Sequence, residues 1–295
     1  MFYNKASKDN PLTDTSLNAD LQLMVTAARQ AGTITMRYHR PGETLLSMDQ
    51  MKDKGQDNPL TKADLEADHL LRTLLLGQRP EYGWLSEETV DDPIRLQKSK
   101  VWVVDPIDGT KEFIMGLPQF AVSIALIDQN QPIAACVFNP AADELYTAIL
   151  GQGAALNGHP IQTTSQTTLL GSSCLASLSE TKRGEWEGFK ETFNITTMGS
   201  IAYKLALVAA GRYDLTFTLS PKNEWDFAAG ELLVRAAGGK VTDLAGQTFR
   251  FNQTNPLTNA VVASNGLLHQ ALLTKLENTP LWTTKLIAQQ ESQSP

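Results

Sequence analysis

Two aspartates just after an apolar run combine the groups that bind a metal ion and a phosphate together. Residues 101–104 are apolar and mostly β-branched, which predicts a buried strand, and the chain is expected to turn sharply at Asp105. Asp108 lies three positions further on, beyond a proline that stiffens the turn. Gly109 and Thr110 follow, where a new helical turn presents free backbone N–H groups. Carboxylates beside such N–H groups predict a site for Mg²⁺ with phosphate.

Further carboxylates fall at the ends of predicted elements. Asp64 lies in the first turn of a helix that a capping box starting at Thr61 would open. Glu87 directly follows a predicted strand, and Asp226 opens another predicted helix. Side chains at element ends converge on clefts more often than they enter cores. Singly, Asp64 and Asp226 are more often helix caps, and Glu87 with Glu88 is more often a solvated turn. Their joint occurrence favours a functional interpretation.

The elements that must position these residues are predicted from hydrophobic periodicity and turn residues. Helices are expected over 16–38, from 61 onward, and over 201–210, 227–237 and 266–276. Strands are expected over 82–86, 101–104, 120–127, 132–138, 144–149, 173–177, 215–219 and 261–263. The strands between 120 and 149 predict an antiparallel meander, whereas 43–59 and 87–100 are expected to be loops, the second with little fixed structure.

The order of these elements predicts two layered subdomains with a cleft between them. Mixed α+β elements come first, and alternating α/β elements follow. The boundary is expected near residue 165, in a Ser/Thr-rich stretch, which gives an N-terminal subdomain over 1–165 and a C-terminal subdomain over 166–295. The first would carry most of the metal ligands, and the second would complete the active site.

Composition narrows the function classes. The chain has 295 residues, a net charge of -7 and scattered Lys and Arg, which excludes a nucleic-acid polymer as the expected partner. No apolar run approaches the roughly 18–20 residues of a membrane span, and Met1–Asn10 is polar, unlike a signal peptide, so a cytoplasmic protein is expected. An acidic protein that handles an anionic substrate needs a local positive charge, which metal ions supply.

Cysteine and histidine offer no alternative chemistry. Cys136 and Cys174 are the only cysteines and have no CxxC spacing, which predicts buried free thiols in preference to a disulfide. The four histidines show no paired spacing, which argues against a zinc site. No Ser, Cys or His lies in a recognisable nucleophile motif, so no covalent intermediate is expected.

Two long motifs carry a resemblance to a known family. Asp105-Pro-Ile-Asp-Gly-Thr110 together with Trp225-Asp-Phe-Ala-Ala-Gly230 resembles the inositol monophosphatase superfamily of magnesium-dependent, lithium-sensitive phosphatases. The longer form, ending in Lys-Glu-Phe113, is similar to its 3'(2'),5'-bisphosphate nucleotidase branch, the CysQ type. Thr61-Lys-Ala-Asp64 and Ser86-Glu-Glu88 lie in the expected order, so the resemblance covers about residue 20 to 275. It implies the layered α-β-α-β-α sandwich of the sugar phosphatases, a mixed α+β and α/β fold.

The resemblance also implies roles for the matching residues and a site for two or three Mg²⁺ ions. The implied metal ligands are the side chains of Glu87, Asp105, Asp108 and Asp226 and the backbone carbonyl of Ile107. Thr110 and Asp64 would orient the attacking water and help to deprotonate it, with Glu87 also counted as catalytic. The N–H groups of Gly109 and Thr110 would hold the phosphate, which Asp226 would also approach.

Substrate contacts are implied less directly. In the nucleotidase branch a Ser and a Lys contact the second phosphate of the nucleotide, and Ser200 and Lys204 match them on one helical face. Ile201 departs from the branch, which often has Ser there. An exposed helix lysine is an equal alternative for Lys204. Lys222 and Asn223 are further candidates to face the ligand.

The function expected from the resemblance is hydrolysis of a small phosphate monoester. The first expectation is removal of the 3'-phosphate of adenosine 3',5'-bisphosphate to give AMP and phosphate. An inositol or sugar monophosphatase is the alternative on the same metal cluster. A catalytically silent metal- or nucleotide-binding regulator is the alternative from another class, against which the intact Asp64 and Thr110 argue. A homodimer is left open.

Overall fold

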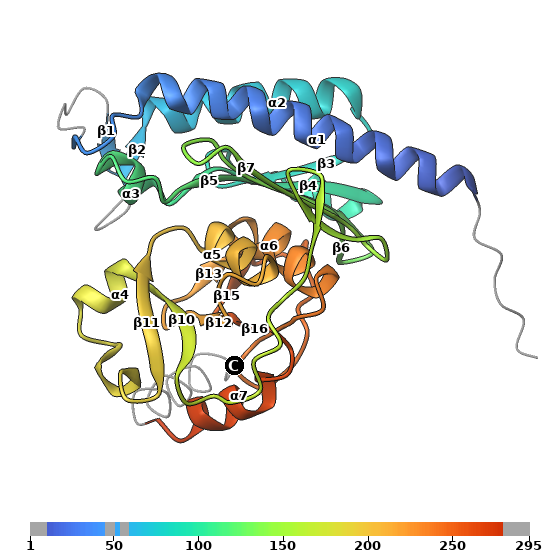
Figure 1. Cartoon of the computed structure of the whole chain (residues 1–295). Helices are drawn as coiled ribbons and strands as arrows, with labels where there is room; N and C mark the ends of the chain where they lie inside the picture. Colours follow the sequence, from blue (N-terminus) through green and yellow to red (C-terminus); the bar gives the residue numbers. More distant parts are fainter. Residues whose placement is uncertain (1–10, 45–50, 54–58, 280–295) are drawn as a thin grey trace, which may run out of the picture.

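The chain folds into five layers that alternate helix and sheet (Figure 1). The computed structural model describes residues 11–44, 51–53 and 59–279. The outer helices α1 (Pro11–Tyr38) and α2 (Lys62–Gln78) cover one face of a seven-stranded sheet. Its other face packs on α5 (Ile201–Ala209) and α6 (Glu224–Ala236), which lie in turn against a five-stranded sheet. α7 (His269–Glu277) forms the last layer on the far side of this sheet, and the short α4 (Leu178–Lys182) lies beside β10 (Ser172–Ser177) and β11 (Phe193–Met198) (Figure 1). The predicted α-β-α-β-α sandwich is confirmed.

The seven-stranded sheet follows the order of the sequence, β3 to β9. Only its first pair is parallel, and the other neighbours are antiparallel, which confirms the predicted meander. Its strands are β3 (Gly83–Ser86), β4 (Lys100–Asp108), β5 (Ala121–Asp128), β6 (Gln131–Asn139), β7 (Glu144–Ile149), β8 (Gly153–Leu156) and β9 (His159–Ile161). The last two were not predicted, because Gly151, Gly153 and Gly158, which lie within or beside them, are typical of turns.

The five-stranded sheet has the order β11-β10-β12-β16-β14. It comprises β10 (Ser172–Ser177), β11 (Phe193–Met198), β12 (Leu215–Phe217), β14 (Lys240–Thr242) and β16 (Val262–Ser264). The last strand in the sequence, β16, lies between β12 and β14 and is antiparallel to both. Two small antiparallel pairs complete the strands: β1 (Met51–Asp53) with β2 (Pro59–Thr61), and β13 (Lys222–Asn223) with β15 (Leu257–Thr258). A short helix α3 (Thr110–Ile114) follows β4.

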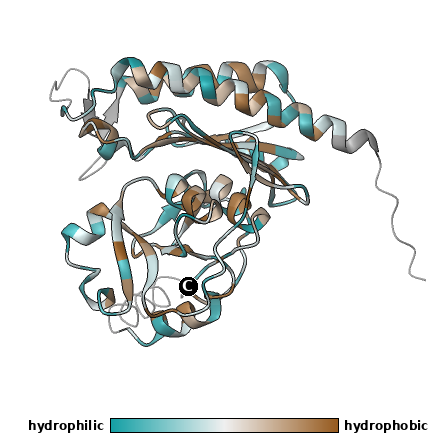
Figure 2. Cartoon of the chain, in the orientation of Figure 1, coloured by the Kyte–Doolittle hydropathy of each residue, from teal (hydrophilic) through white to brown (hydrophobic). Residues whose placement is uncertain are grey.

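Both faces of the seven-stranded sheet are buried, which explains the unbroken apolar run at 101–104. Val101 and Val103 pack in the core with α5 and α6, whereas Trp102 and Val104 pack in the core with α1 and α2. Alternate residues of a strand point to opposite faces, so a sheet covered by helices on both sides needs apolar residues at every position. Figure 2 shows the same pattern, with hydrophobic strands between two-faced helices.

Residues 162–171 connect β9 to β10 and so join the two halves of the chain. We propose the subdomain boundary near residue 165 within this connection. The core beneath the first sheet contains residues from both halves, such as Val137 of β6 and Leu205 of α5. The two halves are therefore packed through a shared core. Among the described residues, no helix is both long and apolar enough to cross a membrane.

Three sequence predictions about local structure are wrong. The strand at 101–104 does not end at Asp105 but continues to Asp108. Its pairing with β5 becomes irregular there: Asp105 lies opposite Ser123 and Asp108 opposite Ala121, so the two residues between them form a bulge. The proline is accommodated in this bulge, where no ladder hydrogen bond is needed.

The segment 87–100, predicted as a loop with little fixed structure, contains a 3₁₀-helix over Pro93–Gln97. Asp92 caps it by accepting a hydrogen bond from the Ile94 N–H at 3.0 Å, and Arg95 is buried. The segment 43–59, also predicted as a loop, contains β1 and the start of β2, while 45–50 and 54–58 lie outside the described residues. Local hydrophobicity reveals neither the 3₁₀-helix nor the strand pair. Charged side chains hold the helix, and the strand pair is only three residues long.

Candidate active site

A pocket of about 310 Å³ opens where β4, α3, α5 and α6 meet, and it brings together most of the predicted site residues. The predicted residues that line it are Glu87, Asp105, Ile107, Asp108, Gly109, Thr110, Ser200, Lys204, Lys222, Asn223 and Asp226. Asp64 lies beside it and contacts Thr110. The site therefore combines residues from both halves of the chain.

Three carboxylates at the base of this pocket form a compact acidic cluster. Glu87, Asp105 and Asp226 each offer one oxygen, and these oxygens all lie within 4.8 Å of one another. Asp105 is fully buried, and burial together with the charge of Glu87 raises its pKa well above the usual value. Withdrawal from water, reinforced by the charges of Asp108 and Glu87, raises the pKa of Asp226 to about 8. The carboxylates of this cluster repel one another, and their oxygen donors suit a hard divalent cation such as Mg²⁺.

Asp226 also has the local role that its position predicts. It is the third residue of α6, and its carboxylate accepts a hydrogen bond from the Asn223 N–H at 3.0 Å. The cap fixes the carboxylate at the start of the helix, and the same side chain lines the pocket. The two interpretations of Asp226, as a helix cap and as a site residue, are thus compatible.

Asp108 lines the pocket but is not part of the three-carboxylate cluster. One of its oxygens accepts hydrogen bonds from the Ser200 hydroxyl and the Ala202 N–H, both at 2.6 Å. The Ser200 hydroxyl also accepts a hydrogen bond from the Tyr203 N–H at 3.0 Å, so it caps α5. The Ser200 hydroxyl therefore donates its hydrogen bond to Asp108, and this bond links the start of α5 to β4.

Thr110 and Asp64 approach each other, as the resemblance implies. The Thr110 hydroxyl lies 3.4 Å from a carboxylate oxygen of Asp64 and 3.0 Å from the Ile107 carbonyl. Asp64 is buried in the first turn of α2, and the Ile107 N–H donates to Asp105 at 3.0 Å. One hydroxyl thus lies between a buried carboxylate and a backbone carbonyl at the pocket wall.

Two glycines allow the pocket walls to approach closely. Gly109 has a φ of 95°, and a Cβ there would lie 2.7 Å from the Gln119 carbonyl oxygen, so any other residue would be strained. At Gly199 a Cβ would overlap the carboxyl group of Glu112. Glu112 is buried, and burial raises its pKa.

Several residues that line the pocket were not predicted. They are Lys111, Glu112, Ser177, Ser179, Met198, Gly199, Ile201 and Pro221. Lys111 and Glu112 belong to the motif that begins at Val101, so their position in that motif could have predicted that they line the pocket. Ser177 and Ser179 carry no such signal, because they reach the pocket from the end of β10 and the start of α4, far along the chain.

Lys204 is buried in the pocket wall, with 2% of its surface exposed. The alternative of an exposed helix lysine is therefore wrong. Burial lowers its pKa, while the negative charges of Glu180, Asp108 and Glu112 oppose that effect. Among the described residues, no carboxylate lies close enough to form an ion pair with its Nζ. The pocket wall thus contains the ammonium group of Lys204, which is not ion-paired with the pocket carboxylates.

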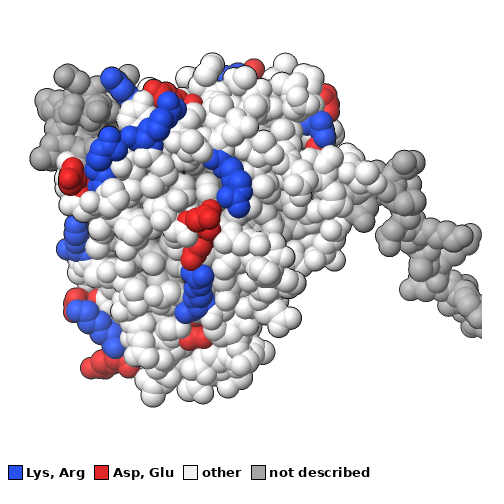
Figure 3. All heavy atoms as spheres, turned by 45° about the horizontal axis from the view of Figure 1, so that its top comes forward, with Lys and Arg blue, Asp and Glu red and all other residues white. Residues whose placement is uncertain are grey.

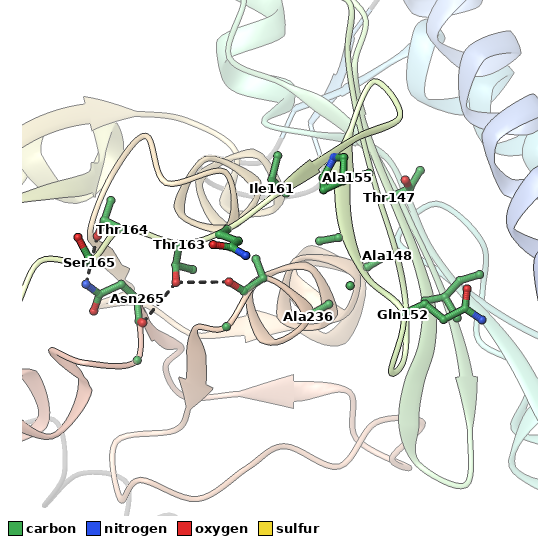
Figure 4. Close-up of a pocket in the computed structure, with 18 of the residues that line it drawn as sticks. Thr147, Ala148, Gln152, Ala155, Ile161, Thr163, Thr164, Ser165, Ala236 and Asn265 are labelled. Atoms are coloured by element: carbon green, nitrogen blue, oxygen red, sulfur yellow. Dashed lines mark hydrogen bonds between the residues drawn. The ribbon is translucent and has the colours of Figure 1, made fainter. Parts of the chain in front are cut away.

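A larger pocket of about 780 Å³ lies elsewhere, between the strands β7 to β9 and the end of α6 (Figure 4). Its described lining contains no acidic, basic or histidine side chain. Thr163 and Thr164 there are hydrogen-bonded to the backbone and side chain of Asn265 (Figure 4). Without titratable groups this pocket cannot supply the predicted chemistry, so the smaller acidic pocket is the candidate active site.

The outer surface gives no sign of a polyanion-binding face on the side seen in Figure 3. There Lys and Arg side chains form short groups with Asp and Glu beside them, and uncharged surface covers most of the face. Both cysteines, Cys136 and Cys174, are free and buried, as predicted.

Comparison with known proteins agrees with this geometry. Residues 17–281 match the inositol monophosphatase family. An inositol-1-monophosphatase of Mesorhizobium japonicum is 36% identical over 265 residues, which cover 87% of this chain and 95% of that protein. The Nus factor SuhB of Escherichia coli K12 is 33% identical, with 88% and 96% covered.

Solved structures show the same similarity. A Thermotoga maritima IMPase superimposes with a TM-score of 0.77 at 26% identity, covering 91% of this chain and 98% of that one. The extragenic suppressor protein SuhB of Bartonella henselae superimposes with a TM-score of 0.76 at 32% identity, covering 88% and 99%.

Proposed function

The chain belongs to the inositol monophosphatase family of phosphatases, and from this premise we propose that it hydrolyses small phosphate monoesters with Mg²⁺ in the acidic pocket. The observation that carries the proposal is the convergence of Glu87, Asp105 and Asp226 on one point. The contact between Thr110 and Asp64 supports it, because a metal site alone would not need this pair.

We assign metal binding to the carboxylates of the pocket. Glu87, Asp105 and Asp226 would hold the first ion, and Asp108 and the Ile107 carbonyl would complete a site for two or three Mg²⁺ ions. When bound, Mg²⁺ lowers the pKa of a coordinated water and offsets charge on the phosphoryl and leaving oxygens. The raised pKa values of Asp105 and Asp226 support this role, since a divalent cation would stabilise both as carboxylates.

The chain itself would position and deprotonate the water. The Thr110 hydroxyl lies 3.4 Å from Asp64, so it can hand a proton to that buried carboxylate while it accepts the proton that the water loses. The oxygen of the deprotonated water would then attack phosphorus in line, the P–O bond to the leaving group would break, and the leaving oxygen would take up a proton from solvent water. The N–H groups of Gly109 and Thr110, which line the pocket, would hold phosphoryl oxygens.

For the substrate we propose adenosine 3',5'-bisphosphate, cleaved at its 3'-phosphate. The observation in favour is Lys204, a buried cation in the pocket wall that fits a second anionic group. Lys222 lines the same pocket and adds positive charge. Inositol 1-phosphate is the second candidate. It is favoured by the names of relatives, since the Mesorhizobium protein is an inositol-1-monophosphatase.

Lys204→Ala separates the two candidates. A charge-assisted hydrogen bond contributes roughly 1.5–3 kcal/mol, so kcat/KM for adenosine 3',5'-bisphosphate should fall about ten- to a hundredfold. The value for inositol 1-phosphate should change little. Lys190→Ala, which removes an exposed charge paired with Glu187, is the control and should alter neither.

Three results would redirect the assignment. If the wild type prefers inositol 1-phosphate, or if Lys204→Ala affects both substrates equally, the second candidate replaces the first. If neither ester, nor any of a panel of sugar phosphates, releases phosphate with Mg²⁺ present, the chain is a silent binding protein. Chelation of the metal should abolish activity, and added Mg²⁺ should restore it.

A further inference from the structure

A buried arginine joins the segment after β3 to the loop before β15. Arg95 is 1% exposed although it lies in the charged segment between Glu87 and Lys100. A guanidinium withdrawn from water needs a partner for each of its N–H groups, because an unpaired buried charge is strongly destabilising. Its partners therefore show what it holds in place.

Those partners come from two distant parts of the chain. Arg95 donates from Nε to one oxygen of Asp91 at 2.6 Å and from Nη2 to the other at 2.9 Å, a bidentate pair. Its Nη1 donates to the Asn252 side-chain oxygen at 2.5 Å, and its Nη2 donates to the Gln253 carbonyl at 2.9 Å. The guanidinium thus links residues 157 positions apart in the sequence.

The same loop is hydrogen-bonded to the first residue of α6. The N–H groups of Asn252 and Gln253 donate to the two carboxylate oxygens of Glu224, at 2.5 and 2.9 Å. Asn252 has a φ of 59°, which lets two successive N–H groups point at one carboxylate. Glu224 is the first residue of α6, and its own N–H donates to the Pro256 carbonyl at 2.9 Å.

These contacts form a continuous bridge between two segments that carry metal-site carboxylates. Glu87 lies four residues before Asp91, and Asp226 lies two residues after Glu224. β4 gives these carboxylates a second connection, because the Glu87 N–H donates to the Val104 carbonyl at 3.4 Å and β4 packs on α6. The arginine bridge adds a connection through side chains. The carboxylate oxygens of Glu87 and Asp226 must stay within 4.8 Å of each other and of Asp105.

We propose that Arg95 is a positioning residue for the metal site: through Asn252, Gln253 and Glu224 it sets the distance between Glu87 and Asp226. This proposal rests on the proposed metal site. Loss of the bridge would leave both carboxylates in the pocket but in a wider range of separations. The affinity for the divalent cation would then fall, because part of the binding free energy would be used to order the ligands.

The test compares Arg95→Met with Arg250→Met. Arg250 belongs to the same loop, but it is exposed, and its guanidinium donates to the side chain of Asn130 in the first half at 2.8 Å instead of joining the bridge to Glu224. Mg²⁺ binding to the metal-free proteins is measured by calorimetry, alongside the Tm without metal and the Mg²⁺ concentration that gives half-maximal activity. We expect Arg95→Met to weaken Mg²⁺ binding about tenfold or more and Arg250→Met to leave it within twofold.

Asn252→Gly serves as a second variant that keeps the left-handed backbone. It removes only the side-chain acceptor of Arg95 and should weaken Mg²⁺ binding less than Arg95→Met does. It decides the question if Arg95→Met does not fold. Wild-type Mg²⁺ affinity in the folded variants, with only the Tm lowered, would overturn the proposal and leave Arg95 a purely structural residue. A wild type that binds no Mg²⁺ would instead refute the metal site itself.

Discussion

At the scale of single residues, Asp105 is the centre of the acidic cluster. It is fully buried, and the charges of Glu87, Asp108, Asp226 and Asp64 all raise its pKa. Without a cation these charges repel one another, so the cluster is a cost to the folded protein that Mg²⁺ removes. Function and stability therefore oppose each other at this position.

Asp105→Asn should separate the two effects. We expect activity to fall about a hundredfold or more, because the metal contributes several kcal/mol to stabilisation of the transition state. The Tm without metal should stay the same or rise, since one repelling charge is gone. Added Mg²⁺ should raise the Tm of the wild type but not of the variant. Turnover at the wild-type rate would contradict the role given to Asp105.

His269 predicts how stability depends on pH. It is buried at the start of α7, and its ring nitrogens lie 2.9 Å from the Thr242 hydroxyl and 3.0 Å from the Ser264 hydroxyl. Burial lowers its pKa from 6.5 to about 4. Between these values the unfolded chain binds a proton that the folded protein does not, so the stability is complete above pH 6.5 and declines as the pH falls towards 4.

The contribution of His269 between pH 7 and pH 5 should be about 2 kcal/mol, at about 1.4 kcal/mol per pKa unit. Urea unfolding of the wild type and His269→Gln at both pH values measures it. Glutamine can also hydrogen-bond but does not titrate, so the variant should lose less stability on acidification. An equal loss in both proteins would show that His269 is not the group responsible.

At the scale of elements, the packing of α5 against α6 places Lys204 and Asp226 on one pocket wall. The two helices meet at Gly230, where a Cβ would lie only 2.6 Å from side-chain carbons of Leu205. The close approach of the two helices therefore depends on a residue without a side chain. The neighbouring residues Ala228 and Ala229 do not reveal this contact in the sequence.

Gly230→Ala should lower the free energy of unfolding by roughly 1–3 kcal/mol through overpacking. Gly77→Ala in α2 is the matched control, because nothing lies within 4 Å of a Cβ there. It should raise stability by roughly 0.4–1 kcal/mol by restricting the unfolded chain. Urea titrations give both values. A neutral Gly230→Ala would mean that the helices can separate without cost.

The elements that were predicted correctly share one property: their own residues carry the signal. The run at 101–104 and the meander over 120–149 are apolar because both faces of their sheet are buried. The segment 87–100 was missed because a single buried arginine orders it through partners at 252 and 253. Ser177 and Ser179 were missed for the same reason, since only the fold brings them to the pocket.

At the scale of the whole molecule, the shared core predicts one cooperative unit. Residues of β5 and β6 pack in one cluster with α5 and α6, so neither half can expose its face alone without losing that core. Calorimetry should show a single transition with equal calorimetric and van't Hoff enthalpies. A fragment of residues 1–165 should not fold by itself. Two separate transitions would show that the subdomains are independent.

The position of β16 has a consequence for the protein while the ribosome is still making it. β12 and β14 both emerge earlier, but β12 is paired only on the side of β10, and β14 has no neighbour until residues 262–264 arrive to lie between the two strands. Until then two strand edges stay open, and open edges pair readily with other chains. An mRNA truncated before codon 262 would therefore yield a polypeptide that aggregates instead of a shortened enzyme. The protein quality control of the cell would degrade that polypeptide.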